Sequence, residues 1–168
     1  MKIHLITERL ILRNLEKKDL QGMFELDSDP AVHEFLGKNP ISKMSQAKET
    51  IDWVQKQYKE IGYGRWAVIE KESNEFVGWC GLKYETQVRE YPYHDIGYRL
   101  KQKFWRKGYG FEAAKACLEY GIDELKLKKI NASAHPDNVG SNKILQKIGL
   151  KLEGTFLHDG EEVNWYEH

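Results

Sequence analysis

A glycine-containing run with two adjacent cations lies in the second half of the chain. In residues 104–113 (FWRKGYGFEA), Arg106 and Lys107 come directly before Gly108-Tyr109-Gly110, and a helical pattern of apolar residues follows. The first turn of a helix leaves backbone amides unpaired and favours negative charge, and glycines let the backbone close around an anion. The run therefore indicates a phosphate or pyrophosphate site. The alternative is a glycine-rich loop that only begins a helix.

Two nucleotide-binding patterns fit the same run less well. Residues 108–113 match the loose dinucleotide pattern G-x-G-x-x-G/A. Residues 101–107 separate them from the preceding strand, however, and the region about 20 residues further on offers lysines where that pattern needs an acidic residue. A nicotinamide-dependent enzyme is therefore a lower-ranked alternative. A Walker A site is excluded, because no Lys-Ser/Thr pair follows the glycines.

The composition excludes several other classes of protein. The chain has 168 residues, of which 40% are hydrophobic, so it is long and apolar enough for one globular domain, and we expect residues 1–168 to form it. Lys plus Arg and Asp plus Glu both number 26, so there is no basic surplus for nucleic acid. We expect no membrane span and no signal peptide, since no long apolar stretch exists.

The cysteines and histidines indicate neither a disulfide framework nor a metal site. Cys80 and Cys117 are far apart and form no C-x-x-C, which excludes a secreted disulfide scaffold and fits a reducing, cytoplasmic location. The six histidines show no H-x-x-x-H and no pairing with cysteine. We therefore expect no metal.

Hydrophobic periodicity and turn residues predict the elements that position the glycine run. Alternation over 7–15 predicts a strand, and apolar residues at intervals of three and four predict an amphipathic helix up to Ile61. The resulting fold class is α/β in the mixed α+β sense, without the strict alternation of a doubly wound sheet. The predicted elements are strands at 7–15, 65–70, 76–83, 95–100, 130–134, 150–157 and 163–166, and helices at 18–25, 30–35, 47–61, 110–125 and 138–148.

Four motifs in order resemble one superfamily over essentially the whole chain. Residues 106–110 look like the R/Q-x-x-G-x-G/A pyrophosphate loop of the GNAT acetyltransferases. Residues 95–113 resemble the branch that acetylates the N-termini of ribosomal proteins (Rim-type) and its small-molecule relatives. In that branch, residues 135–141 match a P-x-N-x-x-S element, 147–150 match K-x-G-F, and 7–13 match the opening strand.

The resemblance implies a fold and a binding mode for acetyl-CoA. The fold is a central mixed, mostly antiparallel sheet with a splayed parallel strand pair and helices on both faces. The pantetheine arm would run along the backbone of one splayed strand, which satisfies polar groups that the splay leaves unpaired. Carried over, the residues that bind acetyl-CoA are Tyr98, Arg99, Leu100, Arg106, Lys107, Gly108, Tyr109, Gly110, Phe111, Asn138, Ser141 and Lys143.

Three of these residues also have ordinary structural explanations. Asn138 matches the asparagine that bonds the pantetheine arm, and it equally suits a helix N-cap. Ser141 matches the position proposed to protonate the leaving thiolate, or it is a solvated helix serine. Lys143 reaches a phosphate of CoA or is solvated. Many relatives place a tyrosine acid where this chain has Leu145, which leaves Ser141, water or another tyrosine such as Tyr98 as the acid.

The general base has three candidates. His94 and Asp95 open the central strand, where many relatives carry a glutamate, and alternation sends their side chains to opposite faces. Glu85 is the third candidate, from the end of the neighbouring strand. Other relatives use a glutamate five residues before the asparagine, and this chain has Ser133 there. The alternative for His94 is a surface histidine at a strand start.

These residues together predict an enzyme. We expect it to move an acetyl group from acetyl-CoA to a primary amine of a small molecule or a protein N-terminus by direct attack. The alternative is an acyl-CoA-binding sensor or partner-docking module without turnover. The expected partners are acetyl-CoA and an amine acceptor that the sequence does not name, with neither nucleic acid nor membrane; a homodimer stays open.

Overall fold

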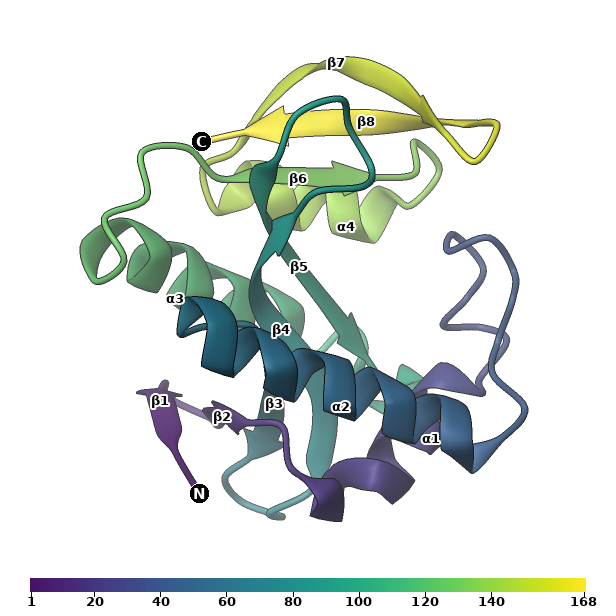
Figure 1. The fold of residues 1–168 in the computed structure, drawn as a ribbon, viewed down its shortest axis with the longest axis vertical. Helices are drawn as coiled ribbons and strands as arrows, with labels where there is room; N and C mark the ends of the chain where they lie inside the picture. The colour runs from purple at the N-terminus through teal and green to yellow at the C-terminus, as the bar shows by residue number, and fades with distance from the viewer.

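Eight strands form a single sheet in the order β1-β2-β3-β4-β5-β6-β8-β7 (Figure 1). The computed structural model describes all residues, 1–168, and every neighbouring pair of strands is antiparallel except β5 and β6. The mixed, mostly antiparallel α/β sheet that the sequence predicts is therefore confirmed. The strands are β1 (Ile3–Ile6), β2 (Leu10–Asn14), β3 (Arg65–Glu70), β4 (Phe76–Glu85), β5 (Tyr93–Leu100), β6 (Asn131–Ala134), β7 (Lys151–His158) and β8 (Glu161–Glu167).

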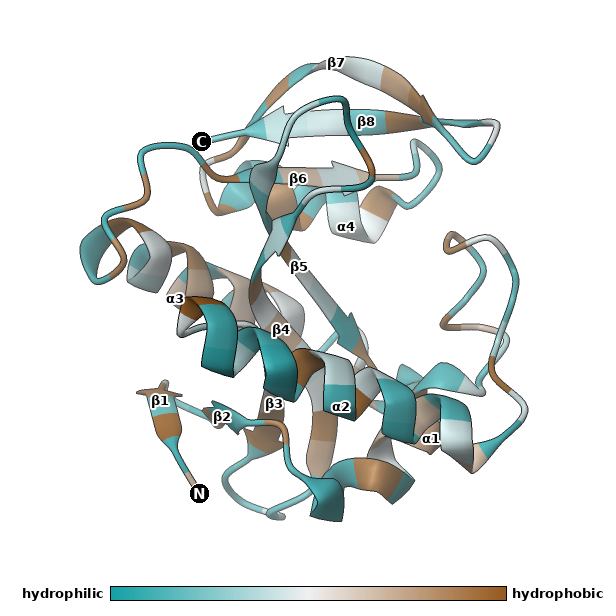
Figure 2. Ribbon diagram, in the orientation of Figure 1, coloured by the Kyte–Doolittle hydropathy of each residue, from teal (hydrophilic) through white to brown (hydrophobic).

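Helices cover both faces of this sheet. They are α1 (Leu20–Asp27), α2 (Met44–Ile61), α3 (Tyr109–Asp123) and α4 (Val139–Lys147), with short 3-10 turns at Lys17–Asp19 and Gln102–Phe104. Helices α1 and α2 pack on one face, where Ala47, Ile51 and Val54 are buried against Ala67 and Ile69 of β3 (Figure 2). Helix α3 packs on the opposite face, and α4 lies beside β6 and contacts α3.

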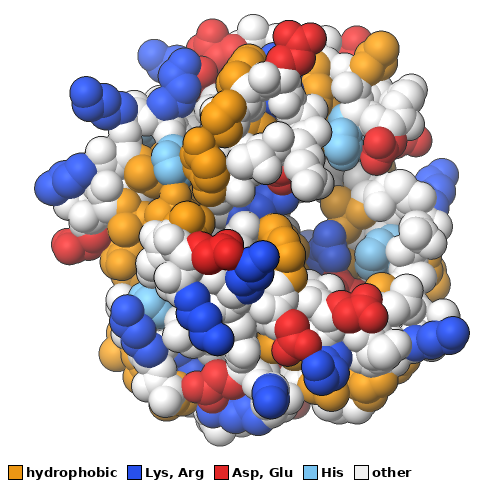
Figure 3. All heavy atoms as spheres, viewed as in Figure 1, with side chains coloured by type: hydrophobic (Ala, Val, Ile, Leu, Met, Phe, Trp, Pro, Cys, Tyr) orange, Lys and Arg blue, Asp and Glu red, His pale blue; other side chains and the backbone are white.

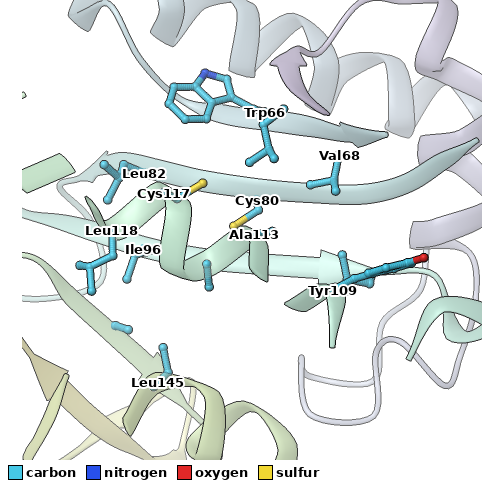
Figure 4. Packing of buried hydrophobic residues seen from close by; sticks show 14 of the residues in the cluster. Trp66, Val68, Cys80, Leu82, Ile96, Tyr109, Ala113, Cys117, Leu118 and Leu145 are labelled. Atoms are coloured by element: carbon cyan, nitrogen blue, oxygen red, sulfur yellow. The ribbon is translucent and has the colours of Figure 1, made fainter. Parts of the chain in front are cut away.

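Small residues bring α3 close to the sheet. Ala113 and Cys117 lie on the buried face of α3, and the hydrophobic cluster around them continues to residues of β4 and β5 (Figure 4). At Gly121 a Cβ atom would lie 2.7 Å from Ile130 Cδ1 and 2.8 Å from Leu82 Cδ1, so no larger residue fits without a shift. This close packing holds α3 against the sheet.

The strands β5 and β6 are joined at one residue pair and then separate. Asp95 pairs with Asn131, and no further pair connects the two strands, although β5 continues to Leu100 along β4. Strand β6 turns instead to β8, with which it pairs from Asn131 to Ala134. The predicted splayed parallel pair is thus present, and the two strands form a V that opens toward Leu100 (Figure 1).

Two predictions about the first 40 residues differ from the structure. The helix expected at 30–35 is a series of turns, because Pro30 and Asp29 hold it in i-to-i+3 hydrogen bonds such as Val32 N to Asp29 O at 3.1 Å. The expected strand 7–15 begins only at Leu10, and residues 3–6 form an additional edge strand. Judged by length and hydropathy, none of the helices could span a lipid bilayer.

Candidate active site

The edge of β5 that faces β6 is the first component of the site. Beyond Asp95 the backbone of Gly97, Tyr98, Arg99 and Leu100 pairs with β4 on one side only. A sheet edge with unpaired amides and carbonyls accepts an additional extended, amide-bearing chain. The pantetheine arm of CoA contains two amides, so this edge fits the strand-like role that the resemblance gives to Tyr98–Leu100.

The N-terminus of α3 is the second component. Arg106 and Gly108 both have left-handed backbone conformations, with φ of 60° and 83°, and α3 starts at Tyr109. No side chain caps this terminus, so the first-turn amides keep their capacity for an anion. Arg106 and Lys107 are exposed beside it. The predicted pyrophosphate loop therefore has the local structure that an anion site requires.

The spacing of residues before Gly108, together with one hydrogen bond, corrects a detail of the expected loop motif. The R/Q-x-x-G-x-G/A pattern places its Arg or Gln three residues before the first glycine, and that position is Trp105, not Arg106. The Trp105 indole Nε1 donates to the Leu100 carbonyl at 2.8 Å. The tryptophan thus ties the loop back to the end of β5.

A clamp that sequence reasoning missed holds the same loop from the other side. Glu112, in the first turn of α3, accepts from Thr7 Oγ1 at 2.6 Å, from the Arg9 amide at 2.8 Å and from Arg9 Nε at 2.7 Å. Arg9 Nη1 also donates to the Lys107 carbonyl at 2.8 Å. Because Glu112 is occupied by these donors, its negative charge is balanced next to the proposed anion site. The Thr7-Glu8-Arg9 pattern was the part of the sequence that could have indicated this clamp.

Tyr98 joins the two components of the site. A Cβ atom at Gly110 would lie 3.1 Å from the Tyr98 ring and 3.2 Å from Ile144 Cδ1, so the ring sits between the start of α3 and α4. Burial raises the pKa of the Tyr98 hydroxyl, and a hydrogen bond with the Ser141 side chain partly offsets that rise. The phenol is therefore protonated at neutral pH. Tyr98 and Ser141, separate candidates in the sequence, are brought together.

The start of α4 supplies further polar groups. Asn138 is the N-cap, and its Oδ1 accepts from the Ser141 amide at 3.1 Å, as the capping alternative expects. Asn142, which sequence reasoning missed, accepts at Oδ1 from the Tyr166 hydroxyl at 2.6 Å and so fixes α4 to β8. Leu145 is buried in the core. Lys143 is exposed on α4.

Asp95, one of the three base candidates, is buried in an ion pair. Its carboxylate bonds Arg65 Nη2, and the two side chains are 12% and 9% exposed. Arg65 also donates to the backbone carbonyls of Gly81 and, at 3.2 Å, of Asp95. The guanidinium therefore links β3, β4 and β5. The Asp95 carboxylate therefore takes part in a structural ion pair at the closed end of the V.

Glu85 is likewise engaged with a cation. It lies 2.5 Å from Lys83 Nζ and accepts from the amides of Thr86 and Gln87 at 2.9 Å each. Burial alone would raise the pKa of Glu85, but the hydrogen bonds from Lys83 and the two amides outweigh it and hold the pKa below its usual range. Glu85 therefore has little capacity to take a proton at neutral pH.

His94 lies at the closed end of the V, next to the Asp95–Asn131 pair. Its Nδ1 is 2.7 Å from the Tyr63 hydroxyl, and its ring lies 5.3 Å from that of Tyr84. Burial lowers the pKa of His94. The imidazole is thus neutral at neutral pH and retains a nitrogen able to accept a proton. Ser133, at the alternative glutamate position, is exposed on β6.

Comparisons with known proteins agree with this geometry. The family model described as an acetyltransferase (GNAT) domain matches residues 9–151. The uncharacterized N-acetyltransferase p20 of Bacillus licheniformis is 34% identical, over 95% of this chain and 88% of its own. A solved GNAT-family acetyltransferase from Bacillus anthracis superposes with a TM-score of 0.81 at 29% identity, covering 100% of this chain and 98% of that one.

A ribosomal acetyltransferase shares the same fold. RimL, a ribosomal L7/L12 alpha-N-protein acetyltransferase solved in complex with coenzyme A, has a TM-score of 0.80 at 17% identity, covering 99% of this chain and 97% of that one. This likeness shows that the two proteins share a fold. Rim-type proteins are therefore among the structural neighbours of this chain. The domain match and the relative above 30% identity decide the family. The chain belongs to the GNAT family and is an acetyl-CoA-dependent N-acetyltransferase.

Proposed function

We propose that the chain transfers the acetyl group of acetyl-CoA to a primary amine of a small molecule or a protein N-terminus by direct attack within the V between β5 and β6. The observation that carries this is the unpaired edge of β5, which ends at the uncapped N-terminus of α3. An amide-bearing arm and a pyrophosphate have adjacent places there. In the reaction the amine nitrogen forms a bond to the thioester carbonyl carbon, and the bond from that carbon to sulfur breaks.

Direct attack is supported by the burial of both cysteines. Cys80 and Cys117 are each 0% exposed and lie in the core between β4 and α3 (Figure 4). Burial and the neighbouring Cys80 raise the pKa of the Cys117 thiol, which keeps it from forming a nucleophilic thiolate. No acyl-cysteine is therefore proposed. Direct attack predicts intersecting lines in two-substrate kinetics, whereas an acyl-enzyme predicts parallel lines.

We assign the protonation of the departing sulfur to Ser141, and we assign to Tyr98 the role of returning a proton to Ser141. The Ser141 side chain is near enough to Tyr98 to influence the pKa of its hydroxyl. In this assignment Ser141 gives its proton to the thiolate, and the neighbouring Tyr98 hydroxyl or water replaces that proton. The raised pKa of Tyr98 keeps its hydroxyl protonated at neutral pH. This pair takes the place that many relatives give to a tyrosine at the Leu145 position.

The acid assignment is tested by two variants and a leaving-group series. Removing a proton donor costs about 10²–10⁴ in rate, so Ser141→Ala should lower kcat by about that factor, and Tyr98→Phe by less, because water replaces the second donor. Both losses should shrink with an acyl donor whose thiol is more acidic. Ser45→Ala, on the exposed start of α2, is the matched control. Wild-type kcat in Ser141→Ala would contradict the assignment.

The ion pairs of Asp95 and Glu85 reduce the number of candidates for the general base. Both carboxylates are engaged with cations, which leaves His94 as the candidate with a free nitrogen. A His94 base predicts that kcat/KM falls at acidic pH with an apparent pKa below 6.5, and that His94→Gln removes this limb. An unchanged pH profile in His94→Gln would exclude it.

Amine-dependent release of the CoA thiol distinguishes turnover from sensing. A transferase releases thiol only when an acceptor amine is present, at a rate that saturates with amine. A sensor or docking module binds acetyl-CoA and releases none. We expect amine-dependent release, and its absence across protein N-terminal peptides, amino acids, polyamines and aminoglycosides would favour the binding module.

A further inference from the structure

An open groove of about 650 Å³ runs along α3 on the side of the N-terminal strands. One wall consists of residues 5–9, and the other consists of residues on α3 that recur every three or four positions from Gly108 to Glu124. The groove therefore follows the helix from end to end. With a rise of about 1.5 Å per residue, this length is about 24 Å, which matches about seven residues of extended chain. Helix α4, with the residues proposed to hold acetyl-CoA, lies on the other side of α3 (Figure 1).

The floor of the groove is apolar and includes a strand edge. The hydrophobic residues that line it are Leu5, Ile6, Phe111, Ala116 and Tyr120. Ile6 is 64% exposed, and Figure 3 shows hydrophobic side chains gathered on the left of the molecule, where Figure 1 places α3 and β1.

Strand β1 has a free edge that can pair with another extended chain. It is the first strand of the sheet and pairs with β2 alone. Leu5 and Ile6 are consecutive, so their side chains point to opposite faces of the strand, yet both line the groove. The groove therefore meets the edge of β1. Unpaired amides and carbonyls at such an edge bind an added strand by main-chain hydrogen bonds.

The charges that line the groove are predominantly negative. Five carboxylates stand against two cations. Both cations are already paired within the groove, Arg9 with Glu112 at 2.7 Å and Lys115 with Glu119 at 2.8 Å. The carboxylates that take part in no ion pair are Glu8, Asp123 and Glu124. Since the whole chain has equal numbers of positive and negative residues, this excess is local.

Two of the unpaired carboxylates lie where the helix itself disfavours them. Asp123 is the last residue of α3, and Glu124 is its C-cap. The C-terminus of a helix favours cations, and α2 and α4 each have a lysine in the last turn, whereas α3 has no basic residue there. Glu119 and Asp123, four residues apart, add a like-charge contact. Lys126 and Lys128 follow in the chain but do not line the groove. A bound cation would therefore balance the charge at this end of α3.

We propose that this groove binds a basic, extended polypeptide segment of a partner protein. The segment adds to the free edge of β1, its apolar side chains cover Ile6 and Tyr120, and its Arg or Lys side chains lie beside Asp123 and Glu124. The length of the groove favours an extended chain over a compact ligand, and the carboxylates favour a basic segment over an acidic one. This interaction goes beyond acetyl transfer and does not depend on it.

The test measures the binding of short peptides to the whole chain by calorimetry, without acetyl-CoA. The probes are Val-Thr-Val-Thr-Val-Arg-Arg, the same sequence reversed, and both with Glu in place of Arg, all with acetylated N-termini and amidated C-termini. They contain no primary amine and therefore cannot act as acceptors. The better arginine peptide should bind at least about tenfold more tightly than its glutamate counterpart, and its affinity should fall with added salt. It should also bind more tightly than spermine, which has no apolar side chains.

Two N-methylated forms of the better peptide test its pairing with β1. In an antiparallel ladder, alternate residues direct their N–H groups to the same neighbouring strand. Methyl groups on the backbone nitrogens of alternate residues should therefore abolish binding in one of the two forms and leave it within about threefold in the other. Unchanged binding of both forms would overturn the addition to β1.

A charge variant with a matched control assigns the preference to the end of α3. Asp123→Asn with Glu124→Gln should weaken binding of the arginine peptide by about fivefold, and the urea midpoint should stay or rise, because charges that the helix terminus disfavours are removed. The control is Glu49→Gln with Glu60→Gln, at exposed positions of α2 outside the groove, which makes the same change in net charge. It should leave the peptide affinity unchanged.

An apolar variant tests the floor of the groove in the same way. Ile6→Ser should weaken the arginine peptide with little change in stability, because Ile6 is largely exposed. Leu157→Ser, at a residue of β7 that is 74% exposed, is the control and should bind as the wild type does. Equal affinity for the arginine and glutamate peptides, binding of spermine as tight as that of the peptide, or equal losses in the variants and their controls would overturn the proposal. So would a failure of every peptide to bind, or a dimer of the wild-type chain in sedimentation that dissociates in Ile6→Ser, since a second copy would then occupy the groove.

Discussion

Replacing Asp95 with asparagine should destabilise the fold far more than it slows the reaction. The Asp95 carboxylate pairs with Arg65, and both side chains are almost fully buried. Arg65 also bonds carbonyls of Gly81, Asp95 and Gly97, so the pair connects three strands at the closed end of the V. In Asp95→Asn the guanidinium stays buried without a counter-charge.

The expected loss can be stated from this burial. Breaking a buried ion pair by removing one partner costs about 3–5 kcal/mol, and the asparagine oxygen still accepts a hydrogen bond, so we expect about 3 kcal/mol. That is a large share of a total stability of about 5–15 kcal/mol. With a urea m-value of about 1–3 kcal/mol/M, the unfolding midpoint should fall by about 1–3 M. Turnover per folded molecule should stay within about tenfold, whereas loss of a general base costs about 10²–10⁴.

Urea unfolding and kinetics on the same preparations check both parts. The partner variant Arg65→Met should be similarly destabilised. The double variant, Arg65→Met with Asp95→Leu, should lose less stability than the sum of the single changes. The reason is that replacing a buried ion pair by apolar groups is nearly neutral. An Asp95→Asn protein that unfolds at the wild-type urea concentration but loses turnover by more than about a hundredfold would refute the reasoning and make Asp95 the base.

Three further predictions concern the loop, pH and metals. Gly110→Asp places a carboxylate at the start of α3, where a Cβ already lies 3.1 Å from the Tyr98 ring, so calorimetry should show CoA affinity lowered by about tenfold or more; unchanged affinity would exclude the pyrophosphate site. Burial lowers the pKa of His4, His33 and His94, so the unfolded chain binds protons at a higher pH than the folded one. The free energy of unfolding should therefore be full above their ordinary pKa of about 6.5 and fall as the pH drops below it; denaturation curves that coincide at pH 7.5 and at about 5.5 would contradict this. Because no three His, Cys, Asp or Glu side chains meet as a metal-binding group, a chelator should leave turnover unchanged; a loss restored by a divalent ion would show otherwise.

The parts of the site that the sequence could predict are those encoded locally. Gly108 and Gly110 mark the loop because a left-handed turn and a close approach to Tyr98 require glycine at those positions. Asn138 marks the start of α4 because an asparagine side chain suits an N-cap. These signals depend on a few consecutive residues, so one sequence is sufficient to read them.

The parts that could not be predicted depend on contacts between distant residues. The Arg9–Glu112 clamp joins positions 103 apart. The Arg65–Asp95 pair joins β3 to β5 across β4. The lack of side-chain hydrogen bonds at the buried His33 becomes visible only once the segment 28–43 is placed in the fold. The helix expected at 30–35 shows the converse error, because local propensity did not show that these residues form i-to-i+3 turns instead of a helix.

The most direct test of acetyl transfer in the V is the stoichiometry of a single assay. Wild-type protein is incubated with acetyl-CoA and an amine from the acceptor panel, free thiol is measured by absorbance, and the N-acetylated amine by mass spectrometry. Equal amounts of thiol and acetylated amine are expected, both lost together in Gly110→Asp and both lowered in Ser141→Ala. Thiol released without acetylated amine, or acetyl-CoA bound with neither product formed, would contradict the account.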